Sequence, residues 1–129
     1  MRALIALALA VVGLATAGDV ASSPSSRTAL RVTFMASESR PPIVRTLGCT
    51  PAMGSVERPA RACAALASVQ RPFAPVPRNA VCTEIYGGPQ TARVTGFYQG
   101  RRIWVVFSRI NGCEIDRWNR HAFLFSGGR

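Results

Sequence analysis

The sequence predicts an α+β fold, built on a five-stranded antiparallel sheet and stabilised by two disulfides. Two pairs of segments alternate apolar and polar residues, and a short turn joins the members of each pair. This pattern is typical of half-buried strands in hairpins. Prolines interrupt the region between the two pairs, so only short helices fit there. The four cysteines form an even set, as expected for a small exported domain.

The N-terminal 17 residues predict export. MRALIALALAVVGLATA starts with a charged residue, continues with an apolar run and ends in the small-x-small triplet Ala15-Thr16-Ala17. This is the layout of a secretory signal peptide, and the apolar run is shorter than the roughly 20 residues that span a bilayer. We expect a signal peptide over residues 1–17, a flexible leader over 18–28, a single domain over 29–129 and a secreted, extracellular product.

The charge of the chain is strongly positive. All 16 basic residues are arginines and six residues are acidic, which gives a formal net charge of +10. Such a charge suits an anionic partner. Solubility and a genome biased toward arginine, alanine, glycine and proline explain it more simply. A basic secreted protein that binds nucleic acid or another anionic surface is therefore kept as the alternative function.

The cysteines are Cys49, Cys63, Cys82 and Cys113. Spacing alone leaves all three pairings open. No pair has the close separation of a zinc knuckle, and the only histidine, His121, lies eight residues after the last cysteine, so we expect no metal and no other cofactor. If the pairing is sequential, each bridge contributes on the order of 3 to 4 kcal/mol in the loop-entropy model.

The first half of the domain predicts a hairpin and a short helix. Apolar residues alternate with polar ones from Ala29 to Met35, and Ile43 to Cys49 is the expected partner strand. Five prolines between Thr50 and Val81 exclude a long regular element there. Pro59 suits an early helical position, and the Ala and Leu content favours a helix through about Val69.

The second half predicts the remaining strands. Thr91 to Gln99 and Arg101 to Ser108 flank Gln99-Gly100, which we expect to form a tight turn. Ala122 to Phe125 is expected to be a short last strand. Together with the first hairpin, these segments give five strands.

Two other interpretations are weaker. Glu84 and His121 could act as base and acid of a ribonuclease, but nothing in the local sequence brings them together. No GxSxG motif supports a serine hydrolase, and we expect no enzyme. The aromatic residues of the second hairpin could stack bases beside arginines, although core packing explains most of them. These residues are Phe97, Tyr98, Trp104 and Phe107.

Several short motifs follow one another in a specific order. Cys82 is followed by Glu84-Ile85-Tyr86, by GFYQGRR at Gly96 to Arg102, by Asn111-Gly112-Cys113 and by AFLF at Ala122 to Phe125. This order, with near-equal spacing, resembles the Streptomyces subtilisin inhibitor family. The first half is similar more loosely, through LGCTP and ACAALA, and the resemblance covers roughly Leu30 to Phe125.

The resemblance implies a five-stranded antiparallel sheet with two short helices, and a homodimer. It also implies the disulfides Cys49–Cys63 and Cys82–Cys113. Finally, it implies inhibition of an extracellular serine protease, either subtilisin-like or a glutamyl endopeptidase, through a substrate-like loop.

Carried over residue by residue, the reactive-site loop consists of Cys82, Thr83, Glu84, Ile85 and Tyr86, with Glu84–Ile85 as the scissile bond. Asn111 resembles the family's asparagine, whose side-chain amide could hydrogen-bond the loop backbone. Where this chain has Glu84, the family usually has Met or Lys. Burying a carboxylate in an apolar pocket costs several kcal/mol, so the resemblance implies a target with a basic or hydroxyl-lined pocket, such as a glutamyl-specific endopeptidase.

The chain departs from the family pattern just after this bond. Tyr86-Gly87-Gly88-Pro89 stands where the family has Tyr-Asp-Pro-Val, so two glycines replace one aspartate. Glycines add backbone freedom, which opposes the preorganisation that inhibition requires. The hairpin aromatic is Tyr98 where the family has Trp.

Overall fold

The computed structural model describes residues 13, 18 and 27–125. The predicted signal peptide and most of the predicted leader lie outside the described residues. Arg27 and Thr28, at the end of that leader, are bound to the sheet, since Gly100 N donates to Arg27 O at 2.8 Å and Cys49 N to Thr28 O at 3.2 Å. None of the helices formed by the described residues is long and apolar enough to span a membrane.

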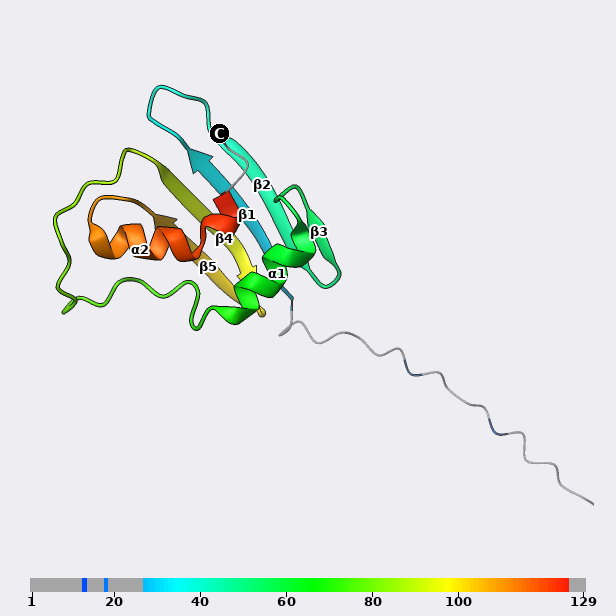
Figure 1. The fold of residues 1–129 in the computed structure, drawn as a ribbon. Coiled ribbons are helices and arrows are strands. Elements are labelled where there is room, and N and C mark those ends of the chain that lie inside the picture. Colours follow the sequence, from blue (N-terminus) through cyan, green and yellow to red (C-terminus); the bar gives the residue numbers. More distant parts are fainter. Residues whose placement is uncertain (1–12, 14–17, 19–26, 126–129) are drawn as a thin grey trace, which may run out of the picture.

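The described chain forms one antiparallel sheet with helices on one of its faces (Figure 1). The strand order is β3-β2-β1-β4-β5, and every neighbouring pair is antiparallel. In chain order the elements are β1 (Ala29–Met35), β2 (Ile43–Cys49), β3 (Ala52–Gly54), α1 (Pro59–Ser68), β4 (Thr91–Tyr98), β5 (Arg101–Phe107), α2 (Gly112–Arg120) and α3 (Ala122–Phe125). The predicted five-stranded α+β fold is confirmed.

Both predicted hairpins are present. β1 pairs with β2, and β4 pairs with β5. Gln99 and Gly100 connect β4 to β5 with φ values of 48° and 78°, as expected for a two-residue turn with positive φ at both positions. The predicted helix from Pro59 is also present, and its proline lies at the first helical turn, where a missing N–H costs nothing.

The predicted strand Ala122–Phe125 is wrong, because these residues form the helical turn α3. Leu124 and Phe125 are neighbours in sequence and both are buried, which the alternating faces of a strand do not favour. A short apolar run does not distinguish strand from helix. The fifth strand is β3 instead, whose residues Ala52–Gly54 are all exposed and carry no alternation that predicts a strand.

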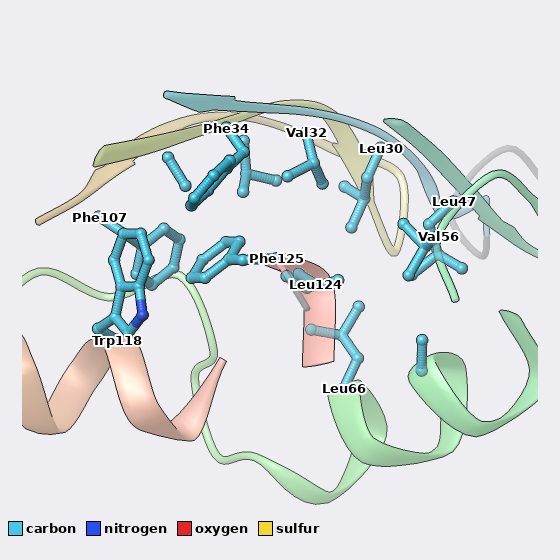
Figure 2. Close-up of a cluster of buried hydrophobic side chains, with 13 residues drawn as sticks. Leu30, Val32, Phe34, Leu47, Val56, Leu66, Phe107, Trp118, Leu124 and Phe125 are labelled. Carbon is cyan, nitrogen blue, oxygen red and sulfur yellow. The ribbon is translucent and has the colours of Figure 1, made fainter. Parts of the chain in front are cut away.

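The core lies between the sheet and the helices (Figure 2). Alternate residues of the strands point into it, and α2 and α3 supply aromatic rings, with Trp118 and Phe125 4.6 Å apart between centroids. The buried apolar residues are Leu30, Val32, Phe34, Leu47, Val56, Ala62, Leu66, Ala92, Val94, Phe107, Trp118, Leu124 and Phe125. The helices therefore cover one face of the sheet and leave the other uncovered by described residues.

Both disulfides have the pairing that the resemblance implies. Cys49–Cys63 joins the end of β2 to α1, and Cys82–Cys113 joins the segment before β4 to the first turn of α2. No cysteine is free.

Candidate functional site

Residues 81–89 form an exposed loop without regular secondary structure, between α1 and β4. Val81 is fully exposed, and Ile85 and Tyr86 are 62% and 65% exposed. Thr83 and Glu84 are exposed as well. We call residues 81–89 the exposed loop.

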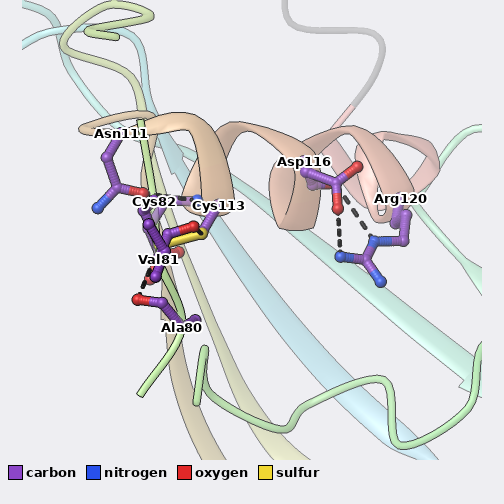
Figure 3. Close-up of a disulfide and its surroundings, with 8 residues drawn as sticks. Ala80, Val81, Cys82, Asn111, Cys113, Asp116 and Arg120 are labelled. Carbon is purple, nitrogen blue, oxygen red and sulfur yellow. Dashed lines mark hydrogen bonds and ion pairs between the residues drawn. A yellow bond between two sulfur atoms is a disulfide. The ribbon is translucent and has the colours of Figure 1, made fainter. Parts of the chain in front are cut away.

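The Cys82–Cys113 disulfide attaches the exposed loop to α2 (Figure 3). Beside it, Gly112 N donates to Thr83 O at 2.9 Å. The contact is close, because a Cβ on Gly112 would lie 2.0 Å from Thr83 Oγ1. A residue larger than glycine at position 112 would therefore require the Thr83 side chain to rotate or the loop to shift.

A second attachment lies four residues further along the exposed loop. Gly87 N donates to Arg109 O at 2.7 Å. The Arg109 side chain also reaches the end of the loop region, where its Nη1 donates to Gln90 Oε1 at 3.3 Å. Glu84, Ile85 and Tyr86 thus lie between two backbone hydrogen bonds, both made by the segment that leads from β5 into α2.

The two glycines that depart from the family pattern have separate roles. Gly87 provides the N–H of the second attachment. Gly88 has a φ of +126°, a conformation that residues with a Cβ rarely adopt. One glycine is therefore fixed by a hydrogen bond, and the other makes the bend that leads to Pro89.

Asn111 begins α2. Its Oδ1 accepts from Glu114 N at 2.9 Å, a helix N-cap in which the side chain satisfies an otherwise unpaired backbone donor. Among the described residues, the hydrogen bond from this segment to Thr83 comes from Gly112 N, not from the Asn111 amide. Asn111 therefore supports the loop through the helix end that carries Gly112 and Cys113.

The chain that leads into the exposed loop is fixed by Arg117. This buried side chain donates from Nε to Ala74 O at 3.1 Å and from Nη1 to Val106 O at 2.9 Å. Its Nη1 also lies 3.3 Å from Glu114 Oε2, and the guanidinium lies over the Phe107 ring. Buried arginines require such partners, since an unpaired buried charge is strongly destabilising. Arg117 thus connects the proline-rich segment, β5 and α2.

His121 is distant from the exposed loop. It caps the C-terminal end of α2 and is 3% exposed. Thr83, in the exposed loop, contacts the opposite, N-terminal end of this helix. The helix has nine residues and is about 13 Å long. Its Nδ1 lies 2.7 Å from Arg117 O, and Nε2 has no hydrogen-bond partner among the described residues. The structure does not bring Glu84 and His121 together as a ribonuclease requires.

Burial lowers the pKa of His121, because the protonated ring would lose its hydration. The charges of Arg117 and Arg120 lower the pKa further, while the backbone carbonyls of Arg117 and Pro72 oppose the shift. The ring is therefore neutral at neutral pH.

Sequence reasoning located the exposed loop but missed most of what fixes it. Asn111 followed by Glu114 three residues later is a pattern typical of a helix start, and this sequence signal for α2 was missed. The carbonyl of Arg109 and the amide of Gly112 are backbone groups that every residue has, so no sequence signal identifies them. Within the described residues, no group of three or more potential metal ligands occurs.

Comparison with known proteins agrees with the resemblance noted in the sequence. Subtilisin inhibitor-like protein 1 from Streptomyces cacaoi is 35% identical over an alignment of 85 residues, which covers 62% of this chain and 76% of that protein. Among solved structures, Streptomyces caespitosus sermetstatin in complex with Bacillus licheniformis subtilisin is similar with a TM-score of 0.49 and 24% identity, over 78% of this chain and 98% of that one. The subtilisin inhibitor-like family model matches residues 25–110, well over half of the chain, and this protein therefore belongs to the subtilisin inhibitor-like family of protease inhibitors.

Proposed function

We propose that this chain is a secreted inhibitor of serine proteases, that the exposed loop is its reactive-site loop, and that Glu84–Ile85 is the scissile bond. The observation that carries the proposal is the position of Glu84 and Ile85. Both side chains are exposed, and on either side the loop is hydrogen-bonded to residues 109–112, through Thr83 and Gly87.

This attachment explains inhibition in physical terms. The nucleophile of a serine protease attacks the carbonyl of Glu84 and forms an acyl-enzyme, while Ile85 carries the new amine. In a free peptide the amine half leaves and water completes hydrolysis. Here Gly87 remains bound to Arg109 and Cys82 to Cys113, so the amine stays beside the acyl group. The bond is then remade more often than it is hydrolysed.

The same attachments raise affinity. Because the exposed loop is already fixed in the free protein, docking loses less conformational entropy than binding of a flexible peptide. An interface of about 1,600 Å² is the usual size for protease–inhibitor complexes, which are among the tightest known. The hydrogen bond of Gly87 opposes the backbone freedom that the glycine pair adds to the loop.

Glu84 determines which protease is inhibited. Its exposed side chain would enter the main specificity pocket, and a carboxylate is bound well only where cationic or hydroxyl groups meet it. A glutamyl endopeptidase offers such a pocket, and a subtilisin-like protease is the target class that the family name indicates. We propose the glutamyl-specific enzyme as the preferred partner.

Three parts of the hypothesis stay predictions. These are the signal peptide over residues 1–17, the single domain that begins near residue 29, and the homodimer. Membership of an inhibitor family supports binding to a protease over catalysis by this chain.

Inhibition constants test the proposal. The oxidised protein is assayed against a glutamyl endopeptidase, subtilisin, trypsin and chymotrypsin, and mass spectrometry then locates any cut. We expect the tightest inhibition with the glutamyl enzyme and a slow single cut at Glu84–Ile85. Glu84→Met should move the preference to subtilisin, because an apolar side chain suits its pocket better than a carboxylate.

Glu38→Met is the matched control. Glu38 is also an exposed acid, in the turn between β1 and β2, and its replacement removes the same charge away from the proposed bond. This variant should retain the preference of the unmodified protein. Rapid degradation by all four enzymes, or an equal effect of both substitutions, would show that Glu84 is not the residue that occupies the specificity pocket of an inhibited protease.

A further inference from the structure

The proline-rich segment, which we define as residues 71–80, leads from α1 to the exposed loop. Its first part is packed against the domain, because Pro72 is buried and the centre of the Phe73 ring lies 5.2 Å from that of Tyr98. Its last part is different, since residues 77–80 are all exposed. The position of this last part, immediately before the loop, therefore depends on attachments other than core packing.

The later part of the segment has few hydrogen bonds. Ala80 N donates to Pro77 O at 3.0 Å, which is a turn within the segment. In the described chain, no hydrogen bond joins residues 75–79 to a residue outside the segment. Pro75 and Pro77 fix their own φ angles and restrict the residues before them. The stretch is therefore stiff, and its direction is determined by where its ends are held.

The helix α2 holds both ends of this stretch. At the start, Arg117 Nε donates to Ala74 O at 3.1 Å. At the end, the Cys82–Cys113 disulfide joins the chain to the first turn of α2. Arg117 and Cys113 are four residues apart, which is about one turn of a helix. Because one short helix carries both attachments, it fixes the two ends of residues 75–81 relative to each other.

The Arg117 side chain reaches the segment beside a cavity rather than through a packed interface. The cavity has a volume of about 280 Å³ and lies between the segment and α2. Side chains that border a void lose the contacts that dense packing provides, so packing here does not replace the hydrogen bond to Ala74. The residues that line the cavity include Val76, Pro77, Ala80, Cys113, Asp116 and Arg120.

Arg117 is itself held firmly without the segment. The side chain is buried, its Nη1 donates to Val106 O at 2.9 Å, and the same atom lies 3.3 Å from Glu114 Oε2. The guanidinium carbon lies 4.2 Å from the centre of the Phe107 ring. These partners belong to β5 and α2, so they already satisfy the buried charge. The bond to Ala74 is an additional contact, and it is the one that extends toward the loop.

We propose that Arg117 is a positioning residue of the reactive-site loop, which it serves by fixing the direction from which the chain enters Cys82 and Thr83. This inference rests on the proposed function. A protease that cuts after Glu84 also contacts the residues before that bond, and small errors in their position cost much of the binding and the chemistry. A direction that is fixed in the free protein raises the fraction of molecules that are ready to dock.

A pair of substitutions removes the contact to Ala74 and preserves the fold. Removing one partner of a buried ion pair is strongly destabilising, whereas replacing both by apolar residues of similar volume is often neutral or stabilising. The test variant is therefore Glu114→Met with Arg117→Met. Asp116→Met with Arg120→Met is the matched control. This second ion pair lies on the same helix and beside the same cavity, but its interactions stay within α2 (Figure 3).

Rate constants for the protease that is inhibited best test the role of Arg117 in inhibition. They are measured on oxidised proteins and expressed per active molecule, counted by titration against the protease, so that unfolded protein does not contribute. For Glu114→Met with Arg117→Met, we expect association to slow about 10-fold, because only a minority of free molecules keep the conformation that docks. Dissociation should change little, since the bound loop makes the same contacts. The control should retain both rate constants.

NMR order parameters of the backbone amides test the structural step without any protease. They should fall at Val76, Arg78 and Asn79 in the test variant and stay unchanged in the control. The two readouts also separate this inference from the proposed function. If the unmodified protein inhibits no protease, the proposed function fails and the role of Arg117 in inhibition fails with it. If the protein inhibits and the test variant retains its association rate, the inference about Arg117 alone fails.

Three results would overturn the inference. The first is an unchanged association rate with unchanged order parameters in Glu114→Met with Arg117→Met. The second is an equal slowing of association in the test variant and in the control, which would assign the effect to α2 as a whole. The third is a loss confined to the fraction of active molecules, with normal rates for those that remain, which would mean that Arg117 supports the fold and does not position the loop.

Discussion

The two disulfides of this molecule look alike in sequence but lie in different surroundings. Cys49–Cys63 joins β2 to α1, and both cysteines pack against the hydrophobic core. Cys82–Cys113 joins the exposed loop to α2, and neither cysteine belongs to the core or to the residues packed against it. Many apolar contacts hold the chain around the first bridge. Around the second, a few polar contacts and the bridge itself determine the shape of the loop.

This difference predicts that the first bridge contributes mainly to stability and that the second, if the proposed function is correct, is also required for inhibition. Near the core, the bridge adds to packing that already specifies the fold. In the exposed loop, Glu84, Ile85 and Tyr86 have little packing of their own, so the attachments at Thr83 and Gly87 depend on how well Cys82 is held. Removing either bridge should lower stability, but only removal of the Cys82–Cys113 bridge should strongly weaken inhibition.

The largest effect should follow loss of the loop bridge. In Cys82→Ser with Cys113→Ser, we expect inhibition of the best target protease to weaken at least about 100-fold, because an unattached loop regains the conformational freedom that preorganisation removed. The variant should also be cut at Glu84–Ile85 much faster, since the amine half can leave. Inhibition constants and the rate of cleavage by mass spectrometry measure both effects.

Cys49→Ser with Cys63→Ser removes the other bridge, the one next to the core. Its free energy of unfolding should fall by about 3 kcal/mol, the loop-entropy value for a closed loop of about 15 residues, as measured by urea unfolding. Well below its melting temperature, its inhibition constant should stay within a few-fold of the original. If the two variants lose inhibition equally, Cys82–Cys113 has no special role in inhibition compared with Cys49–Cys63.

The same difference explains what the sequence could predict. Strands β1, β2, β4 and β5 were predictable, because alternation and a Gln-Gly turn are local signals. β3 and α3 were not, since β3 is exposed along its whole length and α3 is a four-residue apolar run. These two elements are defined by what they pack or pair against, which lies far away in the chain.

The site shows the same limit. The order of short motifs in the sequence carries the resemblance to the family, and this resemblance pointed to residues 82–86, which lie in the exposed loop. The attachments were not predictable, because they use the backbone of Gly112 and Arg109 and a carbonyl of Ala74 that receives Arg117. Such contacts follow from how the segment after β5 turns into α2, and only the folded chain shows that path.

Asn111→Ala tests, with a smaller expected effect than removal of a disulfide, whether the N-terminal end of α2 positions the exposed loop. Loss of the N-cap should lower the free energy of unfolding by about 1 kcal/mol and weaken inhibition a few-fold, because the helix end that carries Gly112 and Cys113 frays. Asn119→Ala, at an exposed position in the same helix, is the control and should change neither property appreciably. A loss of stability in Asn111→Ala with unchanged inhibition would mean that the helix end does not position the loop.

The smallest effect concerns pH and arises at the far end of α2. Burial lowers the pKa of His121 in the folded protein, so below pH 6.5 the unfolded chain binds a proton more readily than the folded one. Stability is complete above pH 6.5 and should fall as the pH decreases below it, with a slope of at most about 1.4 kcal/mol per pH unit for one proton.

Urea unfolding between pH 7.5 and 5 measures this slope. His121→Phe should be less stable at neutral pH, because the bond between Nδ1 and Arg117 O is lost, but its stability should change less with pH over this range. An identical slope in both proteins would assign the pH dependence to groups other than His121. A slope confined to the unmodified protein would show that His121 causes this pH dependence.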